Sequence, residues 1–206
     1  MPFPASVGRV LLVLTTSGSG GHLRALQCVG DLARPRPAFL LHADVWLHAT
    51  TPPDATFAAR FERAFATHAR TVVVTPPQRR GQNEQVIDTF VRALRPAALE
   101  RYDWVLVSNA DVVIANATRL TAMLANPETW AVLANCNPDR RCTAGCIHGL
   151  AHSDFFAFRP REVRFHNETV LEQHAETYVT QIFSPAIALK HDAWIQPRGF
   201  SDRSCR

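Results

Sequence analysis

The chain has 206 residues, of which 47% are hydrophobic and 19% are charged, a composition typical of a globular domain with a sizeable core. Its net charge of +4 is too small, and its basic residues are too dispersed, for a nucleic-acid surface. No apolar run approaches the roughly 20 residues that span a bilayer, and residues 10–14 are too short a run for a signal peptide. We therefore expect a cytoplasmic protein with no membrane span and no nucleic-acid partner.

The first half of the chain alternates short apolar runs with helical patterns. Three runs rich in β-branched and apolar residues predict strands, at residues 10–15, 45–47 and 71–75. Before the third run, phenylalanine recurs every fourth residue at Phe57, Phe61 and Phe65, which predicts a helix that buries one face. Asp54 precedes this helix in a position suited to cap it. Two more helical patterns surround residues 23–29 and 86–94.

The second half of the chain continues this alternation. Strands are predicted at residues 104–107, 130–134, 152–160 and 186–189. Helices are predicted to begin near residues 116 and 168, and an irregular tail begins near residue 197. Strands that alternate with helices predict an α/β fold with a mostly parallel sheet flanked by helices. We expect residues 1–206 to form one such Rossmann-type domain.

Five cysteines are present, and three of them lie close together in the sequence, at Cys136, Cys142 and Cys146, shortly before His148. These four side chains could in principle bind zinc, but their spacing matches no common zinc-site pattern. Free thiols are the default in a reducing compartment. A structural zinc ion and a disulfide within this loop remain open alternatives.

The segment YDWVLVSNADVVIAN, residues 102–116, is the most informative part of the chain. Its apolar run ends in Ser108, Asn109 and Asp111, and ligands of open α/β sheets bind beyond the carboxyl ends of the strands. An acid at that place could hold a divalent cation against a phosphate. The alternative is an ordinary turn, because Asp and Asn are common turn residues.

A glycine-rich loop, TTSGSGGH at residues 15–22, separates the first predicted strand from a helix. Backbone N–H groups in such a loop could bind an anion. The dinucleotide-binding pattern is incomplete, because Leu23 stands where a third glycine is expected, and Asp44 falls slightly past the expected acidic position. A tight turn is the alternative.

Three motifs in this order resemble small GT-A glycosyltransferases: YDWVLVSNADVVI, HSDFFAFRP and HAETYVTQIF. The chain is similar to the N-terminal rhamnosyltransferase-type domain of a large chlorella-virus glycosyltransferase, most strongly over residues 82–194. The resemblance implies a GT-A-like domain that transfers a sugar from a nucleotide-diphosphate donor to an acceptor hydroxyl, such as that of a glycan. It also implies inversion at the transferred sugar and a Mn²⁺ or Mg²⁺ ion on the diphosphate.

The resemblance also assigns roles to individual residues. Asn109 and Asp111 occupy the two acidic positions of the family's DxD motif, so Asp111 would bind the metal ion, with His191 as a second metal or phosphate contact. Asn109 departs from the usual acid, which leaves metal independence open. Glu176 matches the position of a general base that takes the acceptor proton. Asp154 is the competing base, or a contact to sugar or acceptor hydroxyls.

The remaining implied positions would line the nucleotide-sugar site. They are Thr15, Ser17, Gly20, His22, Asp44, Gly81, Asn83 and Asn109. Two other hypotheses stay open. Asn109 favours a non-catalytic homologue that binds a nucleotide or a glycan. The SGSGGH segment also resembles the glycine loop of GT-B enzymes, and that alternative requires a partner chain. The sequence predicts no oligomeric state.

Overall fold

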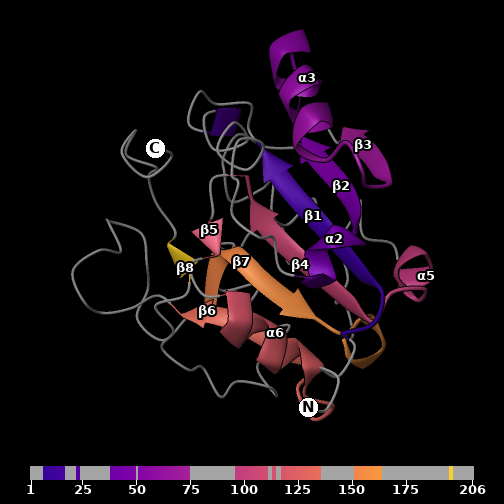
Figure 1. Ribbon diagram of the computed structural model, residues 1–206, viewed down its shortest axis with the longest axis vertical. Coiled ribbons are helices and arrows are strands. Elements are labelled where there is room, and N and C mark those ends of the chain that lie inside the picture. Colours follow the sequence, from indigo (N-terminus) through magenta and orange to yellow (C-terminus); the bar gives the residue numbers. More distant parts are fainter. Residues whose placement is uncertain are drawn as a thin grey trace, which may run out of the picture.

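The computed structural model describes residues 7–16, 22–23, 38–49, 51–74, 96–110, 113–114, 117–135, 151–163 and 195–196. Six strands of the described chain form one sheet in the order β3-β2-β1-β4-β7-β6, which crosses the molecule in Figure 1. Their bounds are β1 (Val10–Thr16), β2 (Asp44–Ala49), β3 (Arg70–Val74), β4 (Trp104–Asn109), β6 (Ala131–Asn135) and β7 (Ala151–Phe158).

The sheet is mostly parallel. Strand β1 pairs in parallel with both β2 and β4, and β2 pairs in parallel with β3. Strand β7 runs antiparallel to both of its neighbours, β4 and β6, so β6 points in the same direction as the first four strands. This arrangement confirms the predicted α/β fold class with a mostly parallel sheet.

The central strands are apolar along nearly their whole length. Strand β1 reads VLLVLTT and β4 reads WVLVSN, and every residue of both strands is buried. Continuous apolar sequence, rather than alternation, is typical of parallel strands that are covered on both faces. The polar residues of both strands are confined to their carboxyl ends.

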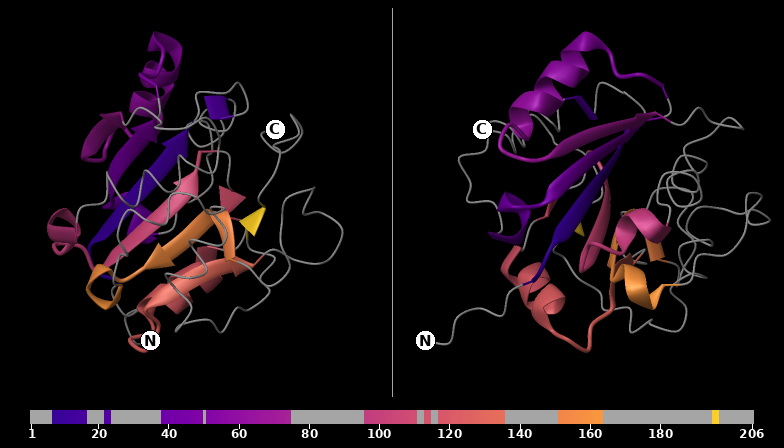
Figure 2. Two further views of the ribbon diagram at one scale, coloured as in Figure 1. Left: turned by 180° about the vertical axis from the view of Figure 1, so that it is seen from behind. Right: turned by 90° about the vertical axis from the view of Figure 1, so that its right-hand side faces the viewer.

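One face of the sheet carries the main hydrophobic core. Leu12 of β1, Leu47 of β2 and Leu106 of β4 belong to it. Three helices lie on this side, as Figure 2 shows, namely α2 (Ala38–Leu41), α3 (Ala55–Ala64) and α6 (Ala117–Ala125). Helix α6 contributes Leu120 and Leu124, and the indole Nε1 of Trp104 donates a hydrogen bond of 3.0 Å to the carbonyl oxygen of Leu124. The helix is therefore fixed to β4 by packing and by a buried hydrogen bond.

Helix α3 follows the predicted phenylalanine spacing. Phe57 and Phe61 are buried beneath it, and the Oδ1 atom of Asp54 accepts a hydrogen bond of 2.7 Å from the backbone N–H of Phe57. This is the capping role that was predicted for Asp54. Phe65 is buried but terminates the helix, because its N–H still donates to the Phe61 carbonyl while its backbone leaves the helical region.

Smaller elements complete the described chain. A two-stranded antiparallel sheet pairs β5 (Val113–Ile114) with β8 (Ile195–Gln196). The short helices are α5 (Pro96–Leu99) and η2 (Pro160–Glu162). Among the described helices, none is long and apolar enough to cross a membrane.

Most predicted strands correspond to observed ones, with ends that move by a few residues. The polar residues Ser108 and Asn109, which the sequence placed beyond the strand, are its last two residues in β4. Outside the described residues lie the predicted helix of residues 86–94, all but the first residue of the one at 23–29, and the helix from residue 168. The predicted strand at 186–189, the tail from residue 197 and all five cysteines also lie outside them.

Candidate functional site

The order of the strands marks one place where the sheet topology reverses. From β1 the chain proceeds through β2 and β3 on one side, and β4 then pairs with the opposite edge of β1. In open α/β sheets, ligands bind at the carboxyl ends of the strands that flank such a reversal. The relevant residues are therefore those that end β1 and β4.

Polar side chains cluster at these two strand ends and are buried. Thr15 and Thr16 end β1, while Ser108 and Asn109 end β4. Thr15 and Asn109 are direct partners in the parallel register, and the Thr15 hydroxyl donates a hydrogen bond to Oδ1 of Asn109. The backbone N–H of Ala110 donates to the carbonyl of Thr15 at 3.0 Å. The two strands thus stay joined up to their last residues.

Thr16, the second threonine of β1, is bonded to His22, the residue that follows segment 17–21 in the sequence. Successive side chains of a strand point to opposite faces, so Thr16 does not share the environment of Thr15. Its hydroxyl lies 3.0 Å from Nδ1 of His22, whose ring is buried and whose backbone, like that of Leu23, is helical. This hydrogen bond joins the two described residues that flank positions 17–21.

A row of buried polar side chains crosses three strands at the same level. His48 of β2 is the register partner of Thr15, which in turn pairs with Asn109. Register partners on neighbouring strands present their side chains on the same face. Burial lowers the pKa of His48 to about 4, so its imidazole is neutral at pH 7. The three side chains of this row are therefore uncharged at that pH.

The structure joins two predicted nucleotide-sugar residues directly, Thr15 and Asn109. A third, His22, is bonded to Thr16, the next residue of β1. The backbone of Asp154 is near them, because Phe155 pairs with Ser108 and Asp154 is the next residue of β7 toward the same edge. Outside the described residues lie Ser17, Gly20, Gly81, Asn83, Asp111, Glu176 and His191.

Asp44 lies elsewhere, and its predicted place in the nucleotide-sugar site is corrected. It is the first residue of β2 and pairs with Leu11, whereas Thr16 pairs with the last residue of β2. At about 3.3 Å per residue, five residues of strand separate the two levels by roughly 16 Å. The sequence spacing suggested an acid at a strand end, but the strand begins at Asp44 and ends at Ala49.

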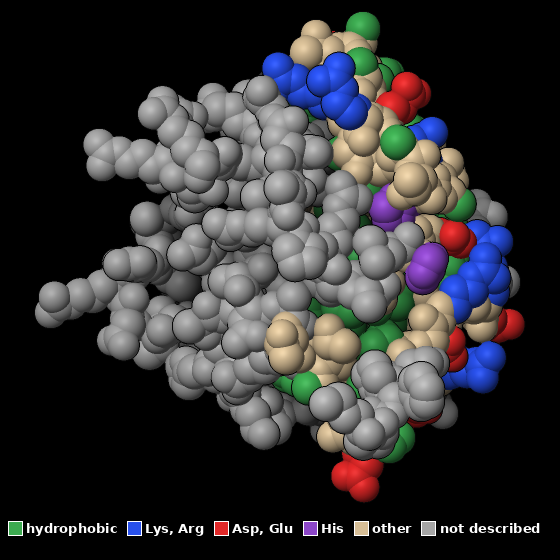
Figure 3. Space-filling view, in the orientation of Figure 1, with side chains coloured by type: hydrophobic (Ala, Val, Ile, Leu, Met, Phe, Trp, Pro, Cys, Tyr) green, Lys and Arg blue, Asp and Glu red, His purple; other side chains and the backbone are tan. Residues whose placement is uncertain are grey.

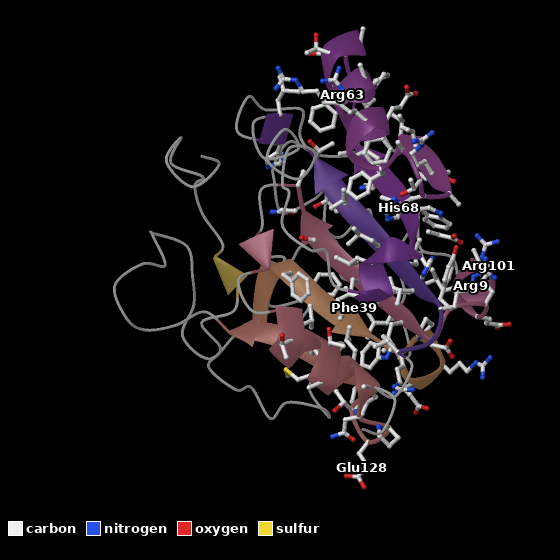
Figure 4. The ribbon with its side chains drawn as sticks, in the orientation of Figure 1. Arg9, Phe39, Arg63, His68, Arg101 and Glu128 are labelled. Carbon is white, nitrogen blue, oxygen red and sulfur yellow. The ribbon has the colours of Figure 1, made fainter. Side chains whose placement is uncertain are left out.

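At the amino ends of the strands, Asp44 takes part in an ion cluster. Its Oδ2 atom accepts a hydrogen bond of 2.5 Å from the Tyr102 hydroxyl and one of 3.2 Å from Arg9, and Arg101 lies 3.7 Å away. The guanidinium carbons of Arg9 and Arg101 lie 5.2 and 4.9 Å from the centre of the Tyr102 ring, and both arginines are close together in Figure 4. Basic and acidic side chains alternate along this edge in Figure 3. Asp44 therefore has a structural role.

The pairing of β5 with β8 connects two distant parts of the chain. Val113 pairs with Gln196, and Ile114 pairs with Ile195. In sequence, Asp111 precedes β5 by two residues and His191 precedes β8 by four. The described neighbours of both candidate metal ligands are thus brought side by side.

The described residues offer neutral oxygen and nitrogen ligands rather than a complete metal site. Hydroxyl, amide and imidazole groups converge at the ends of β1 and β4, and within the described ranges no group of three or more His, Cys, Asp or Glu residues could hold a metal ion. Mn²⁺ and Mg²⁺ prefer sites that contain carboxylates. Asp111 would have to supply the carboxylate here.

Sequence reasoning missed Thr16 and His48. Thr16 was read as part of the glycine-rich loop, although it ends β1. His48 lies inside an apolar strand, where a single polar residue is the signal that could have drawn attention to it.

Comparisons with known proteins add a structural likeness. No protein-family model matches the chain, and no curated protein matches it. Among solved structures, it is similar to the mannosyltransferase PcManGT from Pyrobaculum calidifontis in complex with GDP-Man and Mn²⁺, at 18% identity and a TM-score of 0.47. The match covers 77% of this chain and 46% of that one.

Two other solved structures give a similar result. TarS of S. aureus in complex with UDP-GlcNAc is 13% identical, with a TM-score of 0.41 and coverage of 64% of this chain and 36% of that one. Galactosyltransferase LgtC in complex with donor and acceptor sugar analogs is 14% identical, with a TM-score of 0.41 and coverage of 84% and 65%. The chain spans less than half the length of the mannosyltransferase and of TarS. All three TM-scores lie below 0.5, so this likeness does not establish an activity.

Proposed function

We propose that the chain is a GT-A-like glycosyltransferase that moves a sugar from a nucleotide-diphosphate donor to an acceptor hydroxyl. The observation that carries the proposal is the buried polar cluster at the carboxyl ends of β1 and β4, where the sheet topology reverses. That is where α/β sheets bind nucleotides. Two of the three ordered motifs that resemble GT-A enzymes lie on neighbouring strands, because YDWVLVSNADVVI contains β4 and HSDFFAFRP contains most of β7.

The glycine-rich loop is the proposed binding site for the donor diphosphate. The hydrogen bond between Thr16 and His22 joins the two residues that flank this segment, and a loop that precedes a helix can direct backbone N–H groups at phosphate oxygens. Ser17 and Gly20 lie within the loop. Gly81 and Asn83 are proposed to contact the nucleotide or the sugar.

Asp111 and His191 are the proposed ligands of a Mn²⁺ or Mg²⁺ ion. The pairing of β5 with β8 supports this pair, because it joins the segments that follow each residue. Such an ion, when bound, would stabilise the negative charge that builds up on the departing diphosphate.

A carboxylate is proposed to take the proton from the acceptor hydroxyl. Glu176 is the first candidate and Asp154 the second, as the GT-A resemblance implies. A positioned general base typically contributes about 10²–10⁴-fold to a rate. Attack by the acceptor on the face opposite the leaving diphosphate would invert the sugar configuration.

A second candidate function is a non-catalytic nucleotide- or glycan-binding protein. The neutral row of His48, Thr15 and Asn109 favours it, because a metal-dependent transferase usually presents more than one carboxylate. The two functions differ in whether a bound donor is consumed.

A thermal-shift screen tests the proposal directly. Purified protein is mixed with nucleoside diphosphates and their sugars, with Mn²⁺ or with EDTA, because ligands that bind the native state raise its Tm by mass action. Donor hydrolysis and transfer are then followed with every nucleotide that produces a shift. Stabilisation together with donor turnover supports the transferase, and stabilisation without turnover supports the binding protein.

The variant Asp111→Asn tests the metal ligand. We expect turnover to fall by about 100-fold or more, because a metal ligand contributes several kcal/mol to stabilisation of the transition state. Glu128→Gln is the matched control. Glu128 is exposed in the turn before β6, at the amino end of that strand, whereas Asp111 follows the carboxyl end of β4. If no nucleotide shifts the Tm of the wild-type protein, the proposed function is rejected.

A further inference from the structure

Asn109 is held through both its side chain and its backbone. Its side-chain Oδ1 atom accepts a hydrogen bond from the Thr15 hydroxyl on β1, and its backbone carbonyl oxygen accepts one of 3.1 Å from the hydroxyl of Ser108. Only 8% of Asn109 is exposed, and 1% of Thr15. Both ends of the Thr15–Asn109 bond are therefore removed from water, where an unmade hydrogen bond would be costly.

The sequence places Asn109 where the GT-A pattern has the first of two metal-binding acids. In this structure its amide oxygen is directed at the neighbouring strand. It also lies at the level of Thr15 and His48, in a row that has no charge at pH 7. A carboxylate in this buried place would need a compensating charge, which an amide does not.

We propose that Asn109 is a positioning residue that ties the end of β4 to the end of β1, and that it is not a ligand of the divalent cation. The tie fixes the last residues of β1 and β4 relative to each other; in the sequence, the glycine-rich segment follows β1 and Asp111 follows β4. The metal part of this inference rests on the proposed function. The tie itself does not, because it is a property of the fold.

A double-mutant cycle on protein stability tests the tie without nucleotide or activity. Thr15→Val removes the hydroxyl while preserving the shape of the side chain, and Asn109→Ala removes the amide. We expect each single variant to lower the Tm by roughly 3–8 °C, as loss of one buried hydrogen bond should in a chain of this size. The double variant should lose at least about 3 °C less than the sum of the single losses, because both remove the same interaction.

Thr15→Ser supplies the matched control. Serine keeps the hydroxyl, so Asn109→Ala should lower the Tm in the Thr15→Ser background by as much as it does in the wild type. In the Thr15→Val background its effect should be clearly smaller. Equal effects of Asn109→Ala in all three backgrounds would overturn the tie.

The second statement of the proposal is that Asn109 does not bind the divalent cation. Binding of Mn²⁺ alone, measured by electron paramagnetic resonance of the free ion, tests it. If Asn109 acts only through the tie, Asn109→Ala and Thr15→Val should change the Mn²⁺ affinity to the same extent. A loss of tenfold or more that occurs in Asn109→Ala but not in Thr15→Val would identify Asn109 as a ligand and overturn the inference. If the wild-type protein binds no Mn²⁺, the metal assignment of the proposed function fails, and the stability cycle alone decides the role of Asn109.

Discussion

His48 illustrates what burial does to a single ionisable residue. It lies near the carboxyl end of β2 and is 1% exposed, so its charged form would lose its hydration. Desolvation lowers the pKa of its imidazole to about 4, against 6.5 in an unfolded chain. Above pH 6.5 the side chain is neutral in both states. As the pH falls from 6.5 to 4, only the unfolded state gains the proton, so stability is lost across that range.

The pH dependence of unfolding tests this residue. Between pH 7 and pH 5, His48 should remove about 2 kcal/mol from the free energy of unfolding, which follows from the two pKa values at 1.36 kcal/mol per unit. In His48→Gln this part of the pH dependence should disappear. The exposed His42 provides the control His42→Gln, which should keep the wild-type slope. Urea unfolding at several pH values measures the effect, and an unchanged slope in His48→Gln would contradict it.

Tyr102 shows the same effect in a group that is already neutral. Burial raises the pKa of its phenol, and the hydrogen bond to Asp44 raises it further. The phenol therefore remains a donor to Asp44 at any pH near neutrality. That bond helps to hold the Asp44 side chain in place at the amino end of β2.

At the scale of elements, the start of β1 depends on a close approach to β4. Gly8 has a φ of 82°, a region that side chains disfavour. The N–H of the next residue, Arg9, donates to Oδ2 of Asp103 at 2.7 Å, and the carbonyl of Arg9 accepts from the N–H groups of Asp103 and Trp104 at 2.8 and 3.2 Å. A Cβ on Gly8 would lie 2.4 Å from Oδ2 and 2.9 Å from Cβ of Asp103.

Gly8→Ala should therefore destabilise the protein by about 1–3 kcal/mol. Two causes contribute, the positive φ and the contact with Asp103. The double variant Gly8→Ala, Asp103→Ala separates them, since it relieves the closest contacts but not the φ. A double variant that loses less than the sum of the single losses assigns the cost to the contact. The free energy of unfolding in urea is the measurement, and an effect of Gly8→Ala within about 0.5 kcal/mol of zero would contradict the prediction.

At the scale of the whole molecule, the central strands of the sheet and its edge strand β3 differ in how they are covered. The central strands are buried, and Phe57 of α3 lies in the core with 1% exposure. Strand β3 lies at one edge of the sheet, and its Val72 is 50% exposed. The free energy of unfolding should therefore depend strongly on the side chain at Phe57 and weakly on the side chain at Val72.

Phe57→Ala should lower the free energy of unfolding by about 3–5 kcal/mol, because it removes a buried aromatic ring and leaves a cavity. Val72→Thr keeps a β-branched residue in the edge strand, and we expect an effect within about 0.5 kcal/mol. Chemical denaturation of both variants measures the difference. Similar losses from the two substitutions would show that β3 is covered in solution.

Prediction from sequence succeeded where the signal is local. The phenylalanine spacing of α3 and its Asp54 cap lie within a dozen residues of one another, and the apolar runs of β1 and β4 identify strands by themselves. For the candidate site, the sequence indicated polar residues near the ends of two strands but not which of them meet. Thr15 and Asn109 are hydrogen-bonded across β1 and β4, whereas Asp44 lies at the other end of β2, because an acid near an apolar run can lie at either end of the strand.

The amino-acid sequence by itself determined which segments become the strands of the six-stranded sheet and which face of α3 is buried, because periodicity and capping act between near neighbours in the chain. The tertiary structure alone decided that β1 lies between β2 and β4, that β7 runs antiparallel beside β4, and that Asp44 lies at the opposite edge from Asn109. Thr15 and Asn109 are 94 residues apart in the chain. Their hydrogen bond exists because strand pairing brings these residues together, and no local pattern encodes that pairing.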